Sequence, residues 1–349
     1  MIARLAGPVS FLRSLFFAPG FKRAIFALTA LLFAGSGVSA QDTRPLDIVA
    51  SPILGFQIAG SQTRFGAFRF VGGLKLVSED KEFGGLSGLR LLPDRRHFIA
   101  VNDAGQWLAG TIDRDAAGLP RGITDAVMGS LLRPDAGFIA RKRDGDCEGL
   151  DIAGDRAFLS YERNHRIEAW SVVDGRLAEG TASVIADMNG KRLSSNKGIE
   201  ALAVFPADSA NAGKLLAISE ESLNRDRNIR AFIVDGETTT ELAFTRDGDF
   251  AITDADFLPN GDLLVLERAY SMRKGQGMRL RLVPGAEIAE GAVLAGTILL
   301  SADKTNWIDN MEGMDVSTDE TGAVHVTLIS DDNFSALQQT LLLEFVLEM

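Results

Sequence analysis

The stretch Cys147-Glu148-Gly149-Leu150-Asp151-Ile152, followed after a short turn by Ala157-Phe158-Leu159-Ser160-Tyr161-Glu162, decides the fold because the chain repeats its layout. A short strand opens with a polar, a small and an apolar residue. A more apolar strand then follows and ends on an acidic residue. Similarity at a long interval outweighs any local pattern as evidence, because it marks one structural unit that is used several times.

Four further units share this layout. They open at Leu86-Ser87-Gly88-Leu89, Ile199-Glu200-Ala201-Leu202, Thr253-Asp254-Ala255-Asp256 and Met311-Glu312-Gly313-Met314. Counted from Ser87 through Glu148, Glu200, Asp254 and Glu312, the spacings are 61, 52, 54 and 58 residues. Third and fourth apolar segments follow several of the units, for example 167–173 and 182–188. Four short strands per unit, used repeatedly, predict an all-β fold, a single β-propeller of four-stranded blades.

The number of blades depends on how the ring closes. The fifth unit supplies three strands before the chain ends, and Phe65–Val77 precedes the first unit where a fourth strand is missing. Pairing of this N-terminal strand with the C-terminal strands would remove free sheet edges and give five blades. The segment Leu46–Ala59 is left over, and the alternatives are that it contributes to a sixth blade or that it caps the ring.

Residues 1–40 have the pattern of an export signal. They contain Arg4, Arg13, Lys22 and Arg23 but no acid, then an apolar run over 24–34, and they end in Val38-Ser39-Ala40. The run is shorter than the roughly 20 residues that cross a bilayer, which favours cleavage over a retained anchor. We therefore expect a cleaved signal peptide over 1–40, a mature domain over 41–349, a periplasmic or secreted location, and no membrane attachment after cleavage.

Charge excludes one class of partner. The chain has 36 basic and 47 acidic residues, and loss of the four basic residues of the signal leaves the mature protein near −15. A surface of this sign repels a phosphate backbone, so we expect no nucleic-acid partner.

Acidic residues recur at two places in the repeat. Equivalent positions of a propeller's blades surround one axis, so Glu148, Glu200, Asp254 and Glu312 should converge, with Ser87 in the first unit. A second set of acids stands at the ends of the second strands of the units: Asp103, Glu162, Glu220, Glu267 and Asp331. Clustered carboxylates raise one another's pKa, and a hard cation offsets the repulsion. The first set thus predicts a Ca²⁺ site; the alternative is that these acids bond backbone amides of neighbouring blades or face solvent.

Cations are interleaved with these acids. Arg163 and Arg268 follow Glu162 and Glu267 directly, and Lys197 lies three residues before Glu200. They are the candidate substrate-binding residues for an anionic or ester substrate, because phosphate and carboxylate groups need such donors. The alternative is ion pairing between blades. Glu220 or Glu267, if not bound to metal, is the candidate catalytic general base.

Several ordered motifs resemble those of the phytase-like domain family, described as having the esterase-like activity of phytase. They are Phe83-Gly84-Gly85-Leu86-Ser87-Gly88-Leu89, Cys147-Glu148-Gly149-Leu150, Asn196-Lys197-Gly198-Ile199-Glu200-Ala201-Leu202, Leu263-Leu264-Val265-Leu266-Glu267-Arg268 and Asn310-Met311-Glu312-Gly313-Met314. The resemblance covers about residues 70–347 and implies an exported propeller. The Asp-Ala-Ala-Asp-Asp-Pro-Ala-like run of the calcium-dependent propeller phytases is absent from the sequence, so the resemblance does not extend to their phytate-hydrolysing route.

Two functions follow as hypotheses. The first is a metal-assisted hydrolase of a phosphate or carboxylic ester, in which the cation polarises the scissile group or activates water. The second is a non-catalytic propeller that binds a ligand or a protein, because a fold does not dictate a function. The sequence leaves open whether the protein is an enzyme.

Overall fold

The computed structural model describes residues 43–131, 145–178 and 180–348, and residues 41–349 group as one compact unit. The predicted signal peptide, 1–40, lies outside the described residues. No helix in the described part of the chain is long and apolar enough to cross a membrane.

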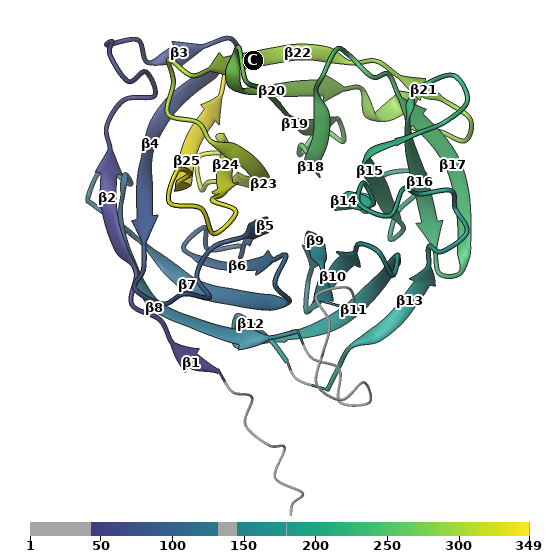
Figure 1. Cartoon of the computed structure of the whole chain (residues 1–349), viewed down its shortest axis with the longest axis horizontal. Helices are drawn as coiled ribbons and strands as arrows, with labels where there is room; N and C mark the ends of the chain where they lie inside the picture. The colour runs from purple at the N-terminus through teal and green to yellow at the C-terminus, as the bar shows by residue number, and fades with distance from the viewer. Residues whose placement is uncertain (1–42, 132–144, 179, 349) are drawn as a thin grey trace, which may run out of the picture. The chain divides into compact units, whose positions relative to one another are not determined.

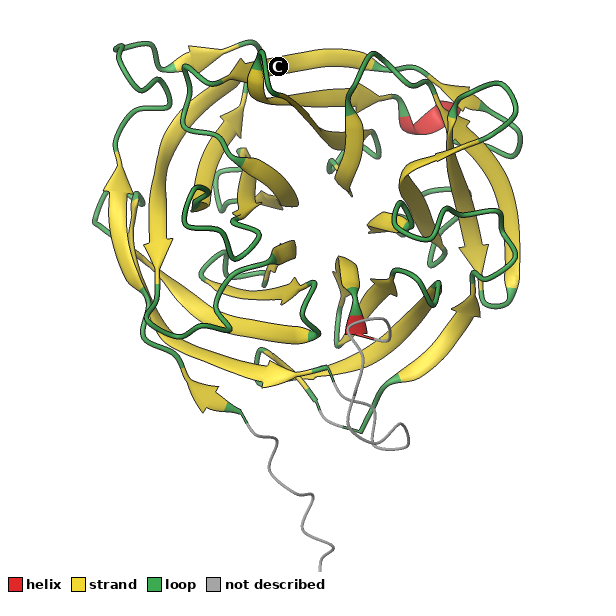
Figure 2. Ribbon diagram, viewed as in Figure 1, coloured by secondary structure: helices red, strands yellow, loops and turns green. Residues whose placement is uncertain are grey.

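The described strands form five sheets arranged as blades around an axis (Figures 1 and 2). Within each blade, the strands are given from the axis outward. Blade 1 contains β5 (Leu86–Leu91), β6 (His97–Asn102), β7 (Gln106–Arg114), β8 (Pro120–Ser130) and β1 (Arg44–Pro45). Blade 2 contains β9 (Cys147–Ala153), β10 (Arg156–Tyr161) and β11 (Arg166–Val173), with β12 (Arg176–Leu177) and β13 (Ser183–Asp187) both paired to β11.

Blade 3 contains β14 (Ile199–Val204), β15 (Leu215–Leu223), β16 (Ile229–Asp235), β17 (Thr238–Phe244) and a parallel β21 (Val293–Leu294). Blade 4 contains β18 (Ala251–Phe257), β19 (Leu263–Ser271), β20 (Gly275–Val283) and β22 (Thr297–Asp303), and a short 3-10 helix, η1 (Gly285–Glu287), follows β20. Blade 5 contains β23 (Asn310–Thr318), β24 (Val324–Asp331), β25 (Thr340–Leu347), β4 (Phe68–Val77), β2 (Val49–Ile53) and β3 (Arg64–Phe65).

The ring closes where the sequence predicts it. β4 pairs antiparallel with β25 over almost its whole length, so the N-terminal strand completes the last blade. The prediction of five blades is confirmed for the described residues, and the alternative of six is not. The leftover N-terminal segment instead adds β2 to the outer edge of blade 5.

The core lies between neighbouring blades. The inner strands are largely buried on both faces, which explains why they read as short apolar runs rather than as alternating patterns. Between blades 4 and 5, Phe56 and Phe345 are fully buried and their ring centroids lie 5.0 Å apart in an edge-to-face arrangement. Trp107 and Trp170 are buried in the core between blades 1 and 2.

Each innermost strand carries a β-bulge near its start. The pairing with the second strand skips one residue there, and the skipped residues are Ser87, Glu148, Glu200, Thr253 and Glu312. A bulge leaves its extra residue outside the ladder and re-aims the side chain. The polar residues of the repeat therefore stand at the one point of each blade where the two innermost strands do not pair regularly.

Candidate functional site

We call the end of the axis where the second strands finish the mouth. The bulged residues lie there and form what we call the inner layer. The carbonyls that precede three glutamates are held by hydroxyl groups. Ser87 Oγ donates to Cys147 O at 2.7 Å, Ser160 Oγ to Ile199 O at 2.8 Å and Thr253 Oγ1 to Met311 O at 2.9 Å. The backbone just before Glu148, Glu200 and Glu312 is therefore fixed, which limits the freedom of these side chains.

A second layer follows the second strands. In register with the bulges, its residues are Asp103, Glu162, Glu220, Arg268 and Asp331. Blade 4 alone contributes a cation to this layer and a threonine, Thr253, to the inner one. The two layers thus contain seven carboxylates and one guanidinium.

Three carboxylates come close enough to share an ion. One oxygen from each of Asp146, Glu148 and Glu162 lies within 4.8 Å of the others. Asp146 and Glu162 are buried, whereas Glu148 is partly exposed. Carboxylate oxygens at this spacing suit a hard divalent cation such as Ca²⁺, which takes six to eight oxygen ligands in flexible geometry.

The electrostatics at the mouth are those of buried carboxylates that lie close together. Burial, with Asp146 and Glu162 adding repulsion, raises the pKa of Glu148 well above its usual range. Burial also raises the pKa of Glu162 to about 7, against a hydrogen bond from the Gly198 amide. Burial, opposed by Arg268, raises the pKa of Glu312 to about 7.

Glu200 supplies an independent observation at the mouth. Its side chain is only 8% exposed, and its Oε2 has no hydrogen-bond partner among the described residues. Burial and the neighbouring Glu220, Glu312 and Glu148 raise its pKa well above the ordinary value. A buried carboxylate oxygen without a donor is costly, so this oxygen is a ready ligand.

The predicted substrate-binding cations are all at the mouth, and each is paired with acids. Arg268 Nε lies 2.9 Å from Glu312 Oε1, and its Nη2 lies 3.3 Å from Glu220 Oε1. Arg163 Nε lies 2.7 Å from Asp146 Oδ2. Lys197 Nζ lies 2.7 Å from Glu221 Oε2 and 3.4 Å from Glu220 Oε2.

Two predicted site residues lie elsewhere. Asp254 is buried against Arg90, with Oδ2 2.8 Å from Nη1, and Glu267 is buried between Arg279 and Arg281. In blade 4, Thr253 and Arg268 hold the mouth positions, and the two predicted acids stand beside them, Asp254 one residue after Thr253 and Glu267 one residue before Arg268.

Sequence reasoning missed Asp146 as a member of the site. It precedes β9 and so falls outside the repeated strand pattern, although its spacing of two from Glu148 in Asp146-Cys147-Glu148 was a usable signal. It also missed the role of Gly85 beside Asp103. Gly85 has φ +63°, and a Cβ there would lie 2.5 Å from both Asp103 Oδ1 and the Phe334 ring, so only a glycine at this position lets these two side chains lie where they do.

A family model, phytase-like with the description "esterase-like activity of phytase", matches residues 81–334. No curated protein matches the sequence.

Among solved structures, the chain is similar to a "glucose dehydrogenase" at 11% identity and a TM-score of 0.43, covering 79% of this chain and 98% of that one. It is also similar to a PQQ-bound aldose sugar dehydrogenase from Streptomyces coelicolor at 11% identity and TM-score 0.41, covering 86% and 99%. A third is the calcium structure of a Trichoderma reesei family AA12 carbohydrate-active enzyme, at 11% identity and TM-score 0.39, covering 86% and 97%.

Proposed function

This chain belongs to the phytase-like family, and on that premise we propose that it is an exported, metal-assisted hydrolase of a phosphate or carboxylic ester. The observation that carries the proposal is the approach of Asp146, Glu148 and Glu162 to within 4.8 Å. Glu200, with its unpartnered buried oxygen, and Glu312 extend the set of ligands. The composition of this set, carboxylates alone, favours Ca²⁺ over softer metals.

Charge explains why a metal suits this mouth. An anionic substrate would meet seven carboxylates in the two layers, while Arg163, Lys197 and Arg268 are already paired with acids. A bound divalent cation reverses the local sign and gives a phosphate or carboxylate group a positive partner. Without a metal, the same mouth repels such a substrate.

The residues at the mouth have separate roles in the proposed reaction. When bound, a divalent cation polarises the scissile group and lowers the pKa of coordinated water. Glu220 is the candidate general base, since it lies at the mouth and Glu267 does not. Arg268 positions Glu220 and Glu312 through its two ion pairs. Arg163 and Lys197 are partly exposed and are the cations that an incoming anion would reach first.

The second candidate function is a binding propeller that uses the same cation without chemistry. One observation favours it: the Ser87 and Thr253 hydroxyls at the mouth donate to backbone carbonyls, so neither stands ready as a nucleophile. The hydrolase would therefore use water as its nucleophile. Its activity would then depend on whether Glu220 lies where it can accept a proton from that water.

Turnover separates the two functions. Purified mature protein is assayed on phosphomonoesters and short acyl esters, with Ca²⁺ and with a chelator. We expect calcium-dependent hydrolysis that Glu220→Gln reduces by about two orders of magnitude, the usual contribution of a general base. Calcium binding without turnover on any substrate would select the binding propeller instead.

A further inference from the structure

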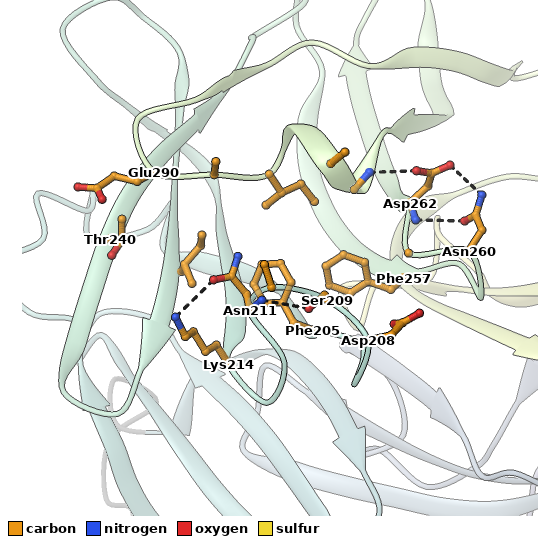
Figure 3. A pocket seen from close by; sticks show the side chains of 17 residues that line it. Phe205, Asp208, Ser209, Asn211, Lys214, Thr240, Phe257, Asn260, Asp262 and Glu290 are labelled. Carbon is orange, nitrogen blue, oxygen red and sulfur yellow. Dashed lines mark hydrogen bonds between the residues drawn. The ribbon is translucent and has the colours of Figure 1, made fainter.

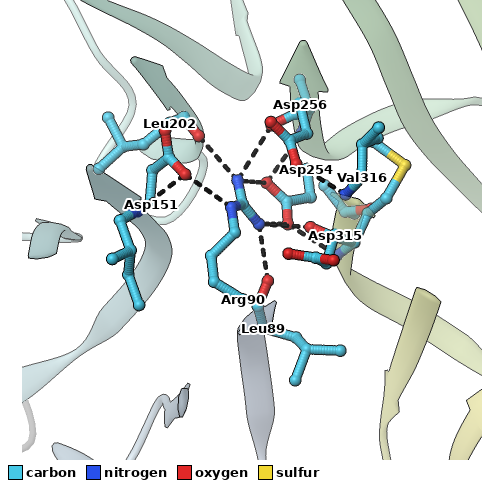
Figure 4. A network of polar contacts seen from close by, with 12 residues as sticks. Leu89, Arg90, Asp151, Leu202, Asp254, Asp256, Asp315 and Val316 are labelled. Atoms are coloured by element: carbon cyan, nitrogen blue, oxygen red, sulfur yellow. Dashed lines mark hydrogen bonds and ion pairs between the residues drawn. The ribbon is translucent and has the colours of Figure 1, made fainter. Parts of the chain in front are cut away.

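A ligand held at the mouth cannot extend along the axis of the ring, because Arg90 occupies the axis. Its guanidinium forms ion pairs to Asp151 of blade 2 and Asp254 of blade 4, both at 2.8 Å (Figure 4). It also donates to the backbone carbonyls of Leu202 in blade 3 and Met314 in blade 5. Asp254 in turn accepts from the Met314 amide at 2.7 Å, the backbone bond predicted as the alternative to a metal ligand. The rest of a substrate held at the mouth must therefore lie sideways over the rim.

An aromatic cavity at the opposite face is separated from the mouth by these contacts. It has a volume of about 640 Å³, and its lining includes Phe205 and Phe257 (Figure 3). The two ring centroids lie 5.1 Å apart, so the rings already pack against each other. A side chain that selects the substrate of the proposed reaction therefore belongs to the rim of the mouth and not to this cavity.

Phe334 stands at the rim of the mouth in a strained conformation. It lies in the loop between β24 and β25, and its φ of 50° follows a φ of 48° at Asn333. Asparagine tolerates this left-handed region, but a bulky residue there is an outlier. The side chain is 46% exposed, and in the described part of the chain only one other aromatic side chain, that of Tyr270, is exposed. Backbone strain of this kind persists mainly at functional sites, which makes the ring a candidate ligand contact.

Two carboxylates of the same loop hold Phe334 in this conformation. Asp331 Oδ1 accepts from the Asn333 amide at 2.6 Å. Asp332 Oδ1 accepts from the Phe334 amide at 3.0 Å and from the Gly85 amide at 3.2 Å. Asp331 is itself a member of the second layer of the mouth. The position of the ring is therefore tied to the acidic layer that would hold the cation.

Phe334 borders both the mouth and a cavity beside it. A Cβ at Gly85 would lie 2.5 Å from both Phe334 Cε2 and Asp103 Oδ1, so these two atoms are no more than twice that distance apart. Phe334 also lines a cavity of about 470 Å³, together with Phe83 and Gln338, between the loops that follow β4 and β24. A cavity of this size is in the range of small-molecule sites and has room for one aromatic ring.

We propose that Phe334 is a specificity-determining residue that binds the aromatic part of an aryl ester, while the phosphate or acyl part binds the cation at the mouth. The inference rests on the proposed function and narrows its substrate class to aryl phosphates or aryl carboxylic esters. A leucine would offer an apolar surface as well, but an aromatic ring adds stacking or edge-to-face contact that exceeds the effect of buried area.

The test measures binding of non-hydrolysable phosphonates to the whole protein, so it does not depend on turnover. Calorimetric titration in Ca²⁺ compares phenylphosphonate with cyclohexylphosphonate, which has a ring of similar size but no π-system. We expect phenylphosphonate to bind at least about threefold more tightly, the order of an aromatic pair's contribution beyond area burial. Methylphosphonate, titrated with Ca²⁺ and with a chelator, reports separately on the cation of the proposed function.

Variants then locate the aromatic contact. Phe334→Leu should abolish the preference for phenylphosphonate over cyclohexylphosphonate. Tyr270→Leu, the same change at the other exposed aromatic side chain, should retain it. Because the preference is a ratio measured within one protein, a uniform loss of affinity does not imitate its loss.

The outcomes separate this inference from the proposed function. Equal binding of the two ring compounds by the wild type, a preference retained in Phe334→Leu, or a preference lost in Tyr270→Leu would each overturn the role of Phe334. Methylphosphonate binding that is the same in chelator would count against the proposed function and leave the aromatic contact standing. Absence of binding by all three phosphonates would overturn both.

Discussion

The guanidinium Nε of Arg268 lies 2.9 Å from Glu312 Oε1 and joins blade 4 to blade 5 at the mouth. Arg268 stands where the other four blades place an acid, so it is the internal counter-charge of the two acidic layers. Its second contact, with Glu220, extends this role to blade 3.

Removing this counter-charge should make the fold depend on calcium. In Arg268→Gln, Glu220 and Glu312 lose their shared partner, so the melting temperature in chelator should fall, while the increase on adding Ca²⁺ should exceed that of the wild type. Arg268→Lys keeps the charge and is the control. Equal calcium responses in Arg268→Gln and the wild type would show that Arg268 does not balance the cation site.

The metal-free protein should become more stable on mild acidification. Burial raises the pKa of Glu162, Glu312 and Asp331 to about 7, from ordinary values of 4.5, 4.5 and 3.8. Between these values the folded state keeps protons that the unfolded state has released, so the free energy of unfolding falls as the pH rises from about 5 to 7.

Urea denaturation in chelator at pH 5.5 and pH 8 measures this effect. Burial lowers the pKa of His165 and His325, which acts in the opposite direction, so Glu312→Gln serves as the comparison and should show a smaller pH dependence. A wild-type protein more stable at pH 8 than at pH 5.5 in chelator would contradict the prediction.

Glu267 should matter for stability and not for calcium. Its carboxylate is fully buried between Arg279 and Arg281, so Glu267→Gln leaves two guanidinium groups short of a partner and should cost about 3 kcal/mol of unfolding free energy. The calcium-induced rise in melting temperature should persist. If Glu267→Gln lost this rise and kept the stability of the wild type, Glu267 would belong to the functional site after all.

Ring closure should depend on the close approach of β4 and β25. A Cβ at Gly73 would lie 2.7 Å from Leu342 O and 2.9 Å from Leu343 Cδ2, so Gly73→Val should separate the closing strands and lower the melting temperature strongly. Gly122→Val in β8 is the matched control, because only Asp113 lies nearby, at 3.8 Å. Comparable melting temperatures for the two variants would argue against closure through this pair.

The fold could be predicted because each blade repeats the same short strands and because Phe65–Val77 had no other partner. The mouth could be predicted in part, since Glu148, Glu200 and Glu312 recur at one place in the repeat. Blade 4 could not be aligned from residue types: Asp254 and Glu267 are acids adjacent to the true positions, and only the bulge in the β18–β19 pairing shows that Thr253 and Arg268 occupy them.

Other features depend on contacts that no repeat encodes. Asp146 joins the site from outside the strand, so its approach to Glu162 rests on how blade 2 is folded. Arg90 holds Asp151 and Asp254 from different blades, which only the closed ring brings together. Repeats predict which residues are equivalent, whereas three-dimensional packing decides which of them meet.

Calorimetric titration of Ca²⁺ into the metal-free protein tests the central claim most directly. We predict binding at the mouth with a matching rise in melting temperature, weakened at least about tenfold, or by 1.4 kcal/mol, in Glu148→Gln and Glu200→Gln. Glu237→Gln, an exposed glutamate in the turn between β16 and β17, should bind as the wild type does. No calcium binding at millimolar concentration, with a melting temperature unchanged by chelator, would contradict the account.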